Sequence, residues 1–168
     1  MPPAMPHWRA MVAADLPAVQ QLAGIIHPDF PEDAAVFADR LSLHPAGSFT
    51  LDVDGAAIGY VLSHPWHFGQ PPKLNVILGA PAQPATTYYI HDLALLPAAR
   101  KTGVAGAIVE ILAAHAHALR LPNMTLVAVN NSVHFWRRQG FDIVVDPLLH
   151  RHLQSYDTQA CFMSRDLT

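Results

Sequence analysis

The stretch that decides the fold runs from His91 to Gly106 and reads His-Asp-Leu-Ala-Leu-Leu-Pro-Ala-Ala-Arg-Lys-Thr-Gly-Val-Ala-Gly. Its first part closes an apolar run, from Tyr88 to Leu96, that only His91 and Asp92 interrupt. Such a run is typical of a central strand covered on both faces. Beyond a turn, residues 103–120 repeat apolar side chains at helical spacing. The stretch therefore predicts a buried strand that leads, through a glycine-containing turn, into a long helix.

The turn between this strand and this helix has the properties of an anion site. Gly103 and Gly106 allow the backbone to approach a ligand closely, and Arg100 and Lys101 stand beside them. The start of a helix leaves several N–H groups unpaired, and its dipole adds positive potential. The turn has neither the Walker pattern of P-loop nucleotidases nor the Gly-x-Gly-x-x-Gly dinucleotide fingerprint. A pyrophosphate is a ligand that suits such a turn.

Shorter segments on both sides of this stretch alternate between strand and helix patterns. The expected elements before it are strand 8–12, helices 15–26 and 33–44, and strands 48–53 and 56–63; those after it are strand 125–129, helix 132–139 and strands 141–145 and 159–164. Asp54-Gly55 is a strong hairpin signal between two of these strands. Five prolines in residues 65–86 indicate an irregular excursion, whose length suggests a pocket wall. This order indicates a mixed sheet with helices on both faces.

The composition limits what the chain can be. Its 168 residues are 51% hydrophobic and 14% charged, so we expect residues 1–168 to form a single domain. Ten basic and 13 acidic residues give a net charge of -3, which provides no electrostatic footprint for nucleic acid or an anionic membrane. A single cysteine, Cys161, fits a reducing compartment, and no secretory signal or bilayer span is evident. We therefore expect a cytoplasmic protein with no nucleic-acid or membrane partner.

Two segments resemble motifs of the GNAT superfamily of N-acetyltransferases. Arg100-Lys-Thr-Gly103-Val-Ala105 resembles the Arg/Gln-x-x-Gly-x-Gly/Ala pattern of the family's motif A. Residues 132–141, Ser-Val-His-Phe-Trp-Arg-Arg-Gln-Gly-Phe, are similar to its motif B. The resemblance extends more loosely to the order of elements along the chain. It implies an α/β (α+β) fold with a GNAT-like mixed, mostly antiparallel central sheet of six to seven strands, flanked by about four helices.

The same resemblance implies the contacts of an acyl-CoA. The backbone of Leu93 to Leu95 would pair with pantetheine, the amides of Lys101 to Gly106 would hold the pyrophosphate, and Phe135 and Trp136 would flank the thioester. The residues expected to bind the cosubstrate acetyl-CoA are Leu93, Ala94, Leu95, Arg100, Lys101, Thr102, Gly103, Val104, Ala105, Gly106, Asn131, Phe135 and Trp136. Two positions depart from the family pattern. Trp136 replaces a tyrosine that many members use as an acid, and an asparagine common before this helix has no aligned equivalent.

Acyl transfer to an amine requires a base, because a protonated ammonium cannot attack a thioester. His91 is the candidate base, since it interrupts the apolar strand two residues before the expected pantetheine contact and imidazole exchanges protons near neutral pH. The arylalkylamine N-acetyltransferases, a branch of the GNAT superfamily, carry a histidine at the matching point. The alternative interpretation of His91 is a core histidine bonded to the backbone.

Other polar side chains are open to two interpretations. By strand alternation, Asp92 is expected on the face opposite His91 unless a bulge re-aims it, and in a structural pairing. Alternative acids are Tyr88, Tyr89 and Tyr156. Residues that either form an acidic rim for a cationic amine or cap the second helix are Asp29, Glu32 and Asp33. No metal site is expected, because His115 and His117, two residues apart on a helix, face different directions.

The function expected is that of an acetyltransferase that moves an acetyl group from acetyl-CoA to a primary amine by direct transfer. The acceptor is unidentified and is either a small-molecule amine or a peptide amine. A catalytically silent acyl-CoA binding or sensing module is the alternative, because Trp136 replaces the usual acid. A nucleotide-binding regulator would use the same anion site. The chain acts either alone or as a homodimer.

Overall fold

The computed structural model describes residues 4–154 and 157–167, and within them seven strands form one mixed sheet in the order β1-β2-β3-β4-β5-β7-β6. The strands are β1 (His7–Ala10), β2 (Phe49–Val53), β3 (Ala56–Trp66), β4 (Thr87–Leu95), β5 (Asn123–Ala128), β6 (Asp142–Ile143) and β7 (Cys161–Asp166). All neighbouring strands pair antiparallel except β4 and β5, which are parallel. The predicted fold class, a mixed and mostly antiparallel sheet, is confirmed.

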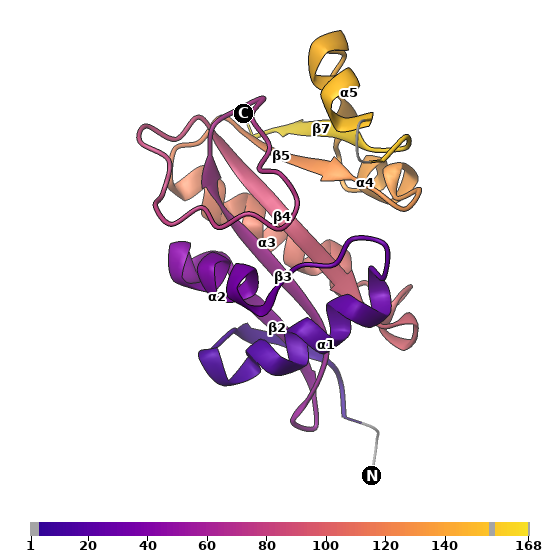
Figure 1. Ribbon diagram of the computed structural model, residues 1–168. Coiled ribbons are helices and arrows are strands. Elements are labelled where there is room, and N and C mark those ends of the chain that lie inside the picture. Colours follow the sequence, from indigo (N-terminus) through magenta and orange to yellow (C-terminus); the bar gives the residue numbers. More distant parts are fainter. Residues whose placement is uncertain (1–3, 155–156, 168) are drawn as a thin grey trace.

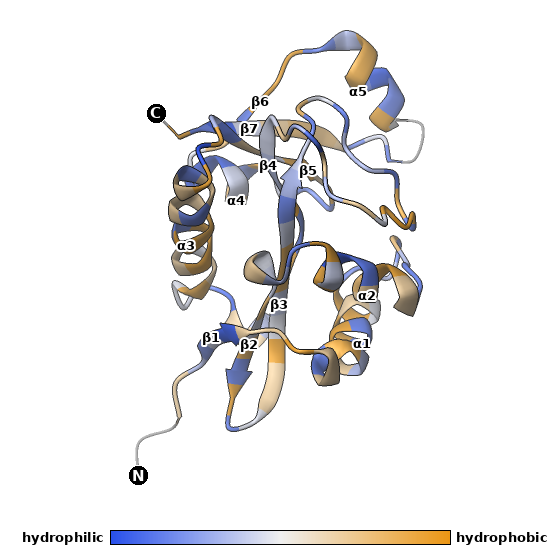
Figure 2. Ribbon diagram, turned by 90° about the vertical axis from the view of Figure 1, so that its left-hand side faces the viewer, coloured by the Kyte–Doolittle hydropathy of each residue, from blue (hydrophilic) through white to orange (hydrophobic). Residues whose placement is uncertain are grey.

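Helices cover both faces of this sheet (Figures 1 and 2). The α-helices are α1 (Leu16–Ile26), α2 (Ala34–Leu43), α3 (Val104–Ala118), α4 (Val133–Arg138) and α5 (Pro147–Gln154). In Figure 2, α1 and α2 lie on one side of the sheet, and α3 and α4 lie on the other. Single 3-10 turns are η1 (Ala13–Asp15), η2 (Pro45–Gly47) and η3 (Pro97–Ala99). No helix among the described residues has both the length and the apolar character needed to cross a bilayer.

Each face of the sheet carries its own apolar core. On one face, α1 and α2 pack against β3 through Val19, Leu22, Phe37, Tyr60 and Leu62. On the other face, α3 packs against β4 and β5 through Ile108, Val109, Leu112, Ala116, Ile90, Met124 and Leu126. The apolar repeat over residues 103–120 includes Ile111 and Leu119, but these two are exposed, because the buried stripe follows residues 108, 112 and 116.

The C-terminal region differs most from the sequence-based expectation. The strand expected over residues 141–145 is limited to Asp142–Ile143, and α5, which was not expected, follows it. The Oδ1 of Asp146 accepts hydrogen bonds from the backbone N–H of Leu148 (3.1 Å) and of Leu149 (3.2 Å). An aspartate at the N-cap followed by proline at the first helical position is a recognised helix start.

Two irregularities in β4 shape the centre of the molecule. β4 and β5 pair only through Tyr88 with Met124 and Tyr89 with Thr125, so the two strands separate beyond that point. Along the other edge of β4, the register with β3 shifts by one residue, which leaves His91 without an opposite partner. Such a β-bulge turns a side chain away from strict alternation.

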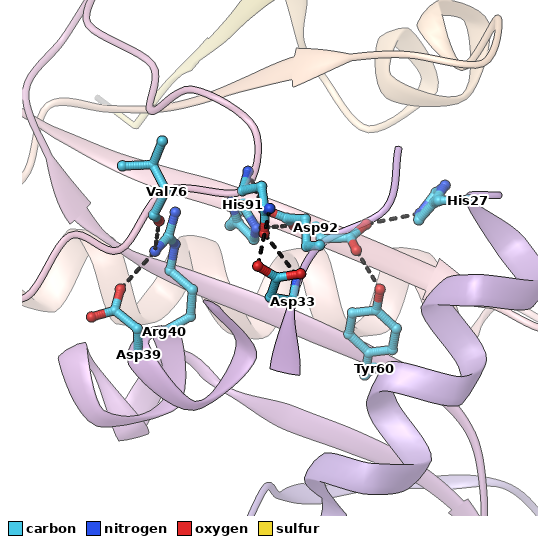
Figure 3. Close-up of polar contacts among 10 residues, drawn as sticks. His27, Asp33, Asp39, Arg40, Tyr60, Val76, His91 and Asp92 are labelled. Carbon is cyan, nitrogen blue, oxygen red and sulfur yellow. Dashed lines mark hydrogen bonds and ion pairs between the residues drawn. The ribbon is translucent and has the colours of Figure 1, made fainter. Parts of the chain in front are cut away.

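The excursion between β3 and β4 lies against α2. The carboxylate of Asp39 accepts the backbone N–H groups of Leu78 (2.9 Å) and Gly79 (3.0 Å). Nη1 of the buried Arg40 donates to the carbonyl of Val76 at 3.0 Å (Figure 3). These contacts hold the excursion over α2.

Candidate functional site

Three adjoining hollows lie where β4 and β5 separate. The groove encloses about 530 Å³ and is lined by residues that include Leu93, Leu95, Lys101, Gly103, Phe135 and Arg138. The gap, about 140 Å³, lies between the two strands and is lined by residues that include Ile90, Leu93, Leu126, Val127 and Trp136. The rim pocket, about 80 Å³, is lined by residues that include Phe30, Glu32, Lys73, Tyr89, His91 and Val129. Groove and gap share Phe135, and gap and rim pocket share His91, so the three hollows adjoin one another.

The turn between η3 and α3 forms one end of the groove. Gly103, the residue before α3, has φ +84°, and Lys101 has φ +64°. Local bonds fix the turn, since Nε of Arg100 donates to the carbonyl of Leu95 (3.2 Å) and Oγ1 of Thr102 donates to that of Ala99 (2.5 Å). No described residue accepts a hydrogen bond from the backbone N–H groups of residues 101–106. These amides at a helix N-terminus are therefore available to an anion.

Most of the residues predicted to bind a coenzyme lie on the groove. Predicted residues that line it are Leu93, Ala94, Leu95, Arg100, Lys101, Gly103, Ala105 and Phe135. Three predicted residues do not line the groove and instead belong to the turn or to the start of α3: Thr102, Val104 and Gly106. The carbonyl of Val104 accepts the indole N–H of Trp8 at 2.9 Å, which ties this helix start to β1.

The structure places the remaining two predicted residues, Trp136 and Asn131, away from the groove. Trp136 is 7% exposed, lines the gap and packs edge-on against Phe135 and Phe141. Asn131 lines a separate hollow beside Asp29, and it is the preceding Asn130 that lies on the groove. Both asparagines have positive φ, so the backbone turns between them.

His91, the predicted base, is held by a carboxylate. Its Nε2 lies 2.8 Å from Oε1 of Glu32, and the two side chains are 9% and 7% exposed. The other carboxylate oxygen of Glu32 accepts the backbone N–H of Asn75 at 3.0 Å, so the excursion helps to fix this pair. Burial alone would raise the pKa of Glu32, but the hydrogen bond and charge of His91 outweigh it and lower the pKa.

Asp92 lies beside the same pocket as His91, and the expectation that it points to the opposite face is wrong. The bulge at His91 breaks the alternation, and both side chains line the gap and the rim pocket. Asp92 accepts hydrogen bonds from the Tyr60 hydroxyl and from Nε2 of His27, the latter at 2.9 Å (Figure 3). Burial would raise the pKa of Asp92, yet its bonds to His27 and Tyr60 lower it. Burial and the Asp92 charge raise the pKa of Tyr60 well above its ordinary value.

His27 was not recognised from the sequence as a site residue. It directly follows α1, just beyond the helix expected over residues 15–26. Its Nδ1 lies 3.2 Å from Nδ2 of Asn130, so both ring nitrogens have partners. Burial would lower the pKa of His27, but the hydrogen bond and charge of Asp92 outweigh burial and raise it. No sequence signal links His27 to Asp92, because 65 residues separate them.

The other candidate residues divide between the pocket and the scaffold. Of the three acids expected at a rim, Glu32 lines the rim pocket, Asp29 lines the hollow beside Asn131, and Asp33 begins α2. Tyr89 lines the rim pocket, whereas the buried Tyr88 exchanges a hydrogen bond with Ser63. Tyr156 lies outside the described residues. Within the described ranges, no group of three or more His, Cys, Asp or Glu side chains could hold a metal ion.

Comparison with known proteins gives a family and a fold. Residues 13–141 match the sequence pattern of the acetyltransferase (GNAT) family. Among curated proteins, none matches this chain.

Three solved structures illustrate the similarity of fold. Ard1 from Thermoplasma volcanium is 16% identical, with a TM-score of 0.74 over 97% of this chain and 98% of that one. Rv2747 from Mycobacterium tuberculosis, in complex with CoA and NLQ, is 15% identical, with a TM-score of 0.69 over 97% and 100%. Naa50 from Arabidopsis thaliana, in complex with the bisubstrate analogue CoA-Ac-MVNAL, is 14% identical, with a TM-score of 0.68 over 95% and 96%. At these identities the similarity concerns the fold.

Proposed function

Because the chain belongs to the acetyltransferase (GNAT) family, we propose that it transfers an acetyl group from acetyl-CoA to a primary amine. The observation that carries this proposal is that the three hollows adjoin one another where β4 and β5 separate. The groove begins under the open amides of residues 101–106, leads to the gap between β4 and β5, and meets the rim pocket there. A coenzyme and an acceptor that entered from these two sides would meet at the gap.

Acetyl-CoA would occupy the groove with its diphosphate at the turn. Backbone N–H groups of residues 101–106 would donate to the diphosphate, and the guanidinium of Arg138 and the ammonium of Lys101 would add positive charge. The separation of β5 leaves one edge of β4 beyond Tyr89 without a strand partner, so the pantetheine amides could pair with the backbone of Leu93–Leu95. The thioester would then lie in the gap beside Phe135.

The rim pocket suits an amine that carries a positive charge. The carboxylates of Glu32 and Asp92 lie on its wall, and their pKa values are both lowered, so both are ionised at neutral pH. An acceptor would enter this pocket with its ammonium group first, because the two carboxylates would attract that group. A small-molecule amine and a peptide amine both present such a group, and the CoA-peptide analogue bound to Naa50 supports the peptide alternative.

Direct transfer needs no covalent link to the protein. The amine nitrogen would attack the thioester carbonyl carbon, a new C–N bond would form, and the C–S bond would break with its electron pair on sulfur. The protein would supply the position of both reactants and a group that accepts the ammonium proton. Trp136 lies at the gap and offers no exchangeable acid, so the thiolate would leave without a tyrosine donor.

A catalytically silent acyl-CoA binding module is a second candidate, favoured by the tryptophan at position 136. Such a module would use the same groove, so a binding measurement alone does not distinguish the two functions. A measurement of turnover distinguishes them, because only the enzyme consumes acetyl-CoA.

Release of free thiol from acetyl-CoA in the presence of amines tests the proposal. We expect calorimetry to detect acetyl-CoA binding, and we expect thiol release that depends on a primary amine and yields the N-acetyl product by mass spectrometry. Tertiary amines of matched size are the control, since their acylated nitrogen has no proton to lose. Binding without turnover on a broad panel of primary amines and peptides would favour the silent module, and no binding at millimolar acetyl-CoA would end both.

A further inference from the structure

We propose that His27, oriented by Asp92, is the base that accepts the proton of the acceptor ammonium. This inference rests on the proposed transfer reaction and names a residue for it. Of the residues that the structure describes, His27 alone lines the groove, the gap and the rim pocket. Its imidazole therefore stands where the thioester and the acceptor amine would meet.

The hydrogen bonds of His27 fix which nitrogen is the base. The carboxylate of Asp92 can only accept, so Nε2 of His27 carries a proton and donates it across 2.9 Å. Nδ1 of the neutral ring then holds the lone pair, which accepts the side-chain amide of Asn130 at 3.2 Å until the acceptor ammonium takes the place of that donor. Asn130 can also present its carbonyl oxygen once Nδ1 is protonated, so the same side chain can serve both protonation states.

Asp92 is itself held in place for this role. Its second oxygen accepts the hydroxyl of Tyr60, a buried side chain of β3, and the pKa of Tyr60 is raised, so that hydroxyl keeps its proton. The carboxylate therefore stays charged and stabilises the imidazolium of His27 when it forms, as the carboxylate of a catalytic triad does. The order Tyr60, Asp92, His27 can be followed in Figure 3.

His91 is placed for a different task. It lines the gap and the rim pocket but not the groove, and Glu32 occupies its Nε2 within a pair whose side chains are almost fully buried. A carboxylate on Nε2 is common to His91 and His27, so it is their position that separates them, and only His27 reaches the groove. His91 and Glu32 therefore form a wall of the acceptor pocket, and His27 is the imidazole at the meeting point.

The proton balance of the step is simple. Nδ1 of His27 takes one proton from the ammonium, and the freed electron pair on nitrogen forms the C–N bond while the C–S bond breaks. The nitrogen loses a second proton to solvent as the amide forms. The imidazolium returns its proton to the thiolate, which leaves as free thiol, and His27 is neutral again for the next cycle.

The charges around His27 set the pH dependence of this base. Asp92 from β4 and Glu32 from the connector between α1 and α2 raise the pKa of His27, while burial and Arg100 from the turn lower it. The net pKa lies above the ordinary value of about 6.5. The rate at saturating substrates therefore falls as pH drops through a midpoint above about 6.5, because protonated His27 cannot accept a proton.

Replacement of His27 by glutamine tests the proposal. Glutamine can still donate an N–H to Asp92 but has no basic nitrogen. We expect kcat to fall by roughly 100-fold or more, as for loss of a general base, and the acid limb of the kcat profile to disappear. Acetyl-CoA affinity measured by calorimetry should stay within about threefold of wild type, because the groove keeps its diphosphate contacts.

Asp92→Asn gives a second, independent readout. Asparagine at this position removes the charge that stabilises the imidazolium, so we expect the acid limb to move to lower pH and kcat to fall. His117→Gln, on the exposed side of α3, is the control and should leave the whole profile unchanged. A merely structural role of His27 would reduce thermal stability without moving the limb.

Two results would overturn the assignment of His27 as the base. Both can be told apart from a result that contradicts acetyl transfer itself. If His27→Gln keeps the wild-type kcat and acid limb while His91→Gln abolishes turnover, His91 is the base. If Asp92→Asn leaves the limb where it was, His27 is not the group that titrates. If wild-type protein binds acetyl-CoA but acetylates no amine, the transfer reaction fails and the base assignment fails with it.

Discussion

Replacement of Gly103 by valine is expected to weaken acetyl-CoA binding by at least roughly 100-fold, the equivalent of about 2.7 kcal/mol. Gly103 has φ +84°, a conformation that β-branched residues avoid, and holding one there costs of order 1–3 kcal/mol. The turn would relax to negative φ, and the amides of residues 101–106 would no longer point at one common site. Calorimetric titration with acetyl-CoA measures the effect.

Gly55→Val is the matched control for this experiment. Gly55 has φ +82°, and at both glycines no heavy atom lies within 4 Å of an added Cβ, so the backbone strain is alike. Gly55 belongs to the hairpin between β2 and β3, which does not line the groove. Both variants should lose similar stability, but only Gly103→Val should lose affinity. Equal affinities of the two variants would show that the turn does not bind the coenzyme.

Acidification is expected to destabilise the fold through His64, by about 2 kcal/mol between pH 6.5 and 4.5. The His64 side chain is completely buried, and burial lowers its pKa to about 3. In the unfolded chain the ring binds a proton near pH 6.5, whereas the folded protein excludes that proton until pH 3. The stability is therefore present above pH 6.5 and is lost as pH falls, at about 1.4 kcal/mol per pH unit.

Neighbouring groups explain why His64 stays neutral. Its Nδ1 donates to the carbonyl of Pro65 at 2.9 Å, and its Nε2 has no hydrogen-bond partner among the described residues. The charges of Arg40, His44 and His91 further disfavour a proton on the ring. Burial lowers the pKa of His44 and of His115 as well, so these two rings add to acid sensitivity.

Urea unfolding of wild type and His64→Asn at several pH values measures this effect. Asparagine can keep the donor to the carbonyl of Pro65 but does not titrate, so its free energy of unfolding should depend less steeply on pH below 6.5. His27 acts in the opposite sense, since its raised pKa favours the folded state below pH 6.5, and it is present in both proteins. Identical slopes for the two proteins would contradict the role given to His64.

Regular periodicity explains why so much of the fold could be predicted. The continuous apolar run of β4 and the apolar repeat of α3 are long, and the Asp54-Gly55 hairpin has positive φ at both residues, as its sequence requires. By contrast, α5 is only eight residues long, too short for a repeat to stand out, and it was not expected. Its start depends on the N-cap Asp146 and on Pro147. This capping signal covers only two residues, so it is weak evidence for a helix when the sequence is considered alone.

The residues of the candidate site could be predicted where the order of strand, turn and helix places them. They could not be predicted where the β-bulge in β4 changes the direction of a side chain. The groove residues follow from the strand, turn and helix order, so Leu93 and Gly103 were placed from sequence. Asp92 was assigned to the wrong face because a one-residue bulge is invisible to strict alternation. His27 was missed because its partner Asp92 is 65 residues away and because Pro28, which follows it, marks only the end of a helix.

The proposed function depends above all on the backbone amides between Lys101 and Gly106, which would hold the diphosphate of the coenzyme. Amide proton–nitrogen NMR spectra, recorded during titration with acetyl-CoA and separately with S-acetylpantetheine, test it most directly, because the second ligand lacks the diphosphate. Amides of residues 101–106 should shift with acetyl-CoA and stay in place with S-acetylpantetheine, while those of Leu93–Leu95 should shift with both. Unmoved resonances for residues 101–106 at saturating acetyl-CoA would contradict the account.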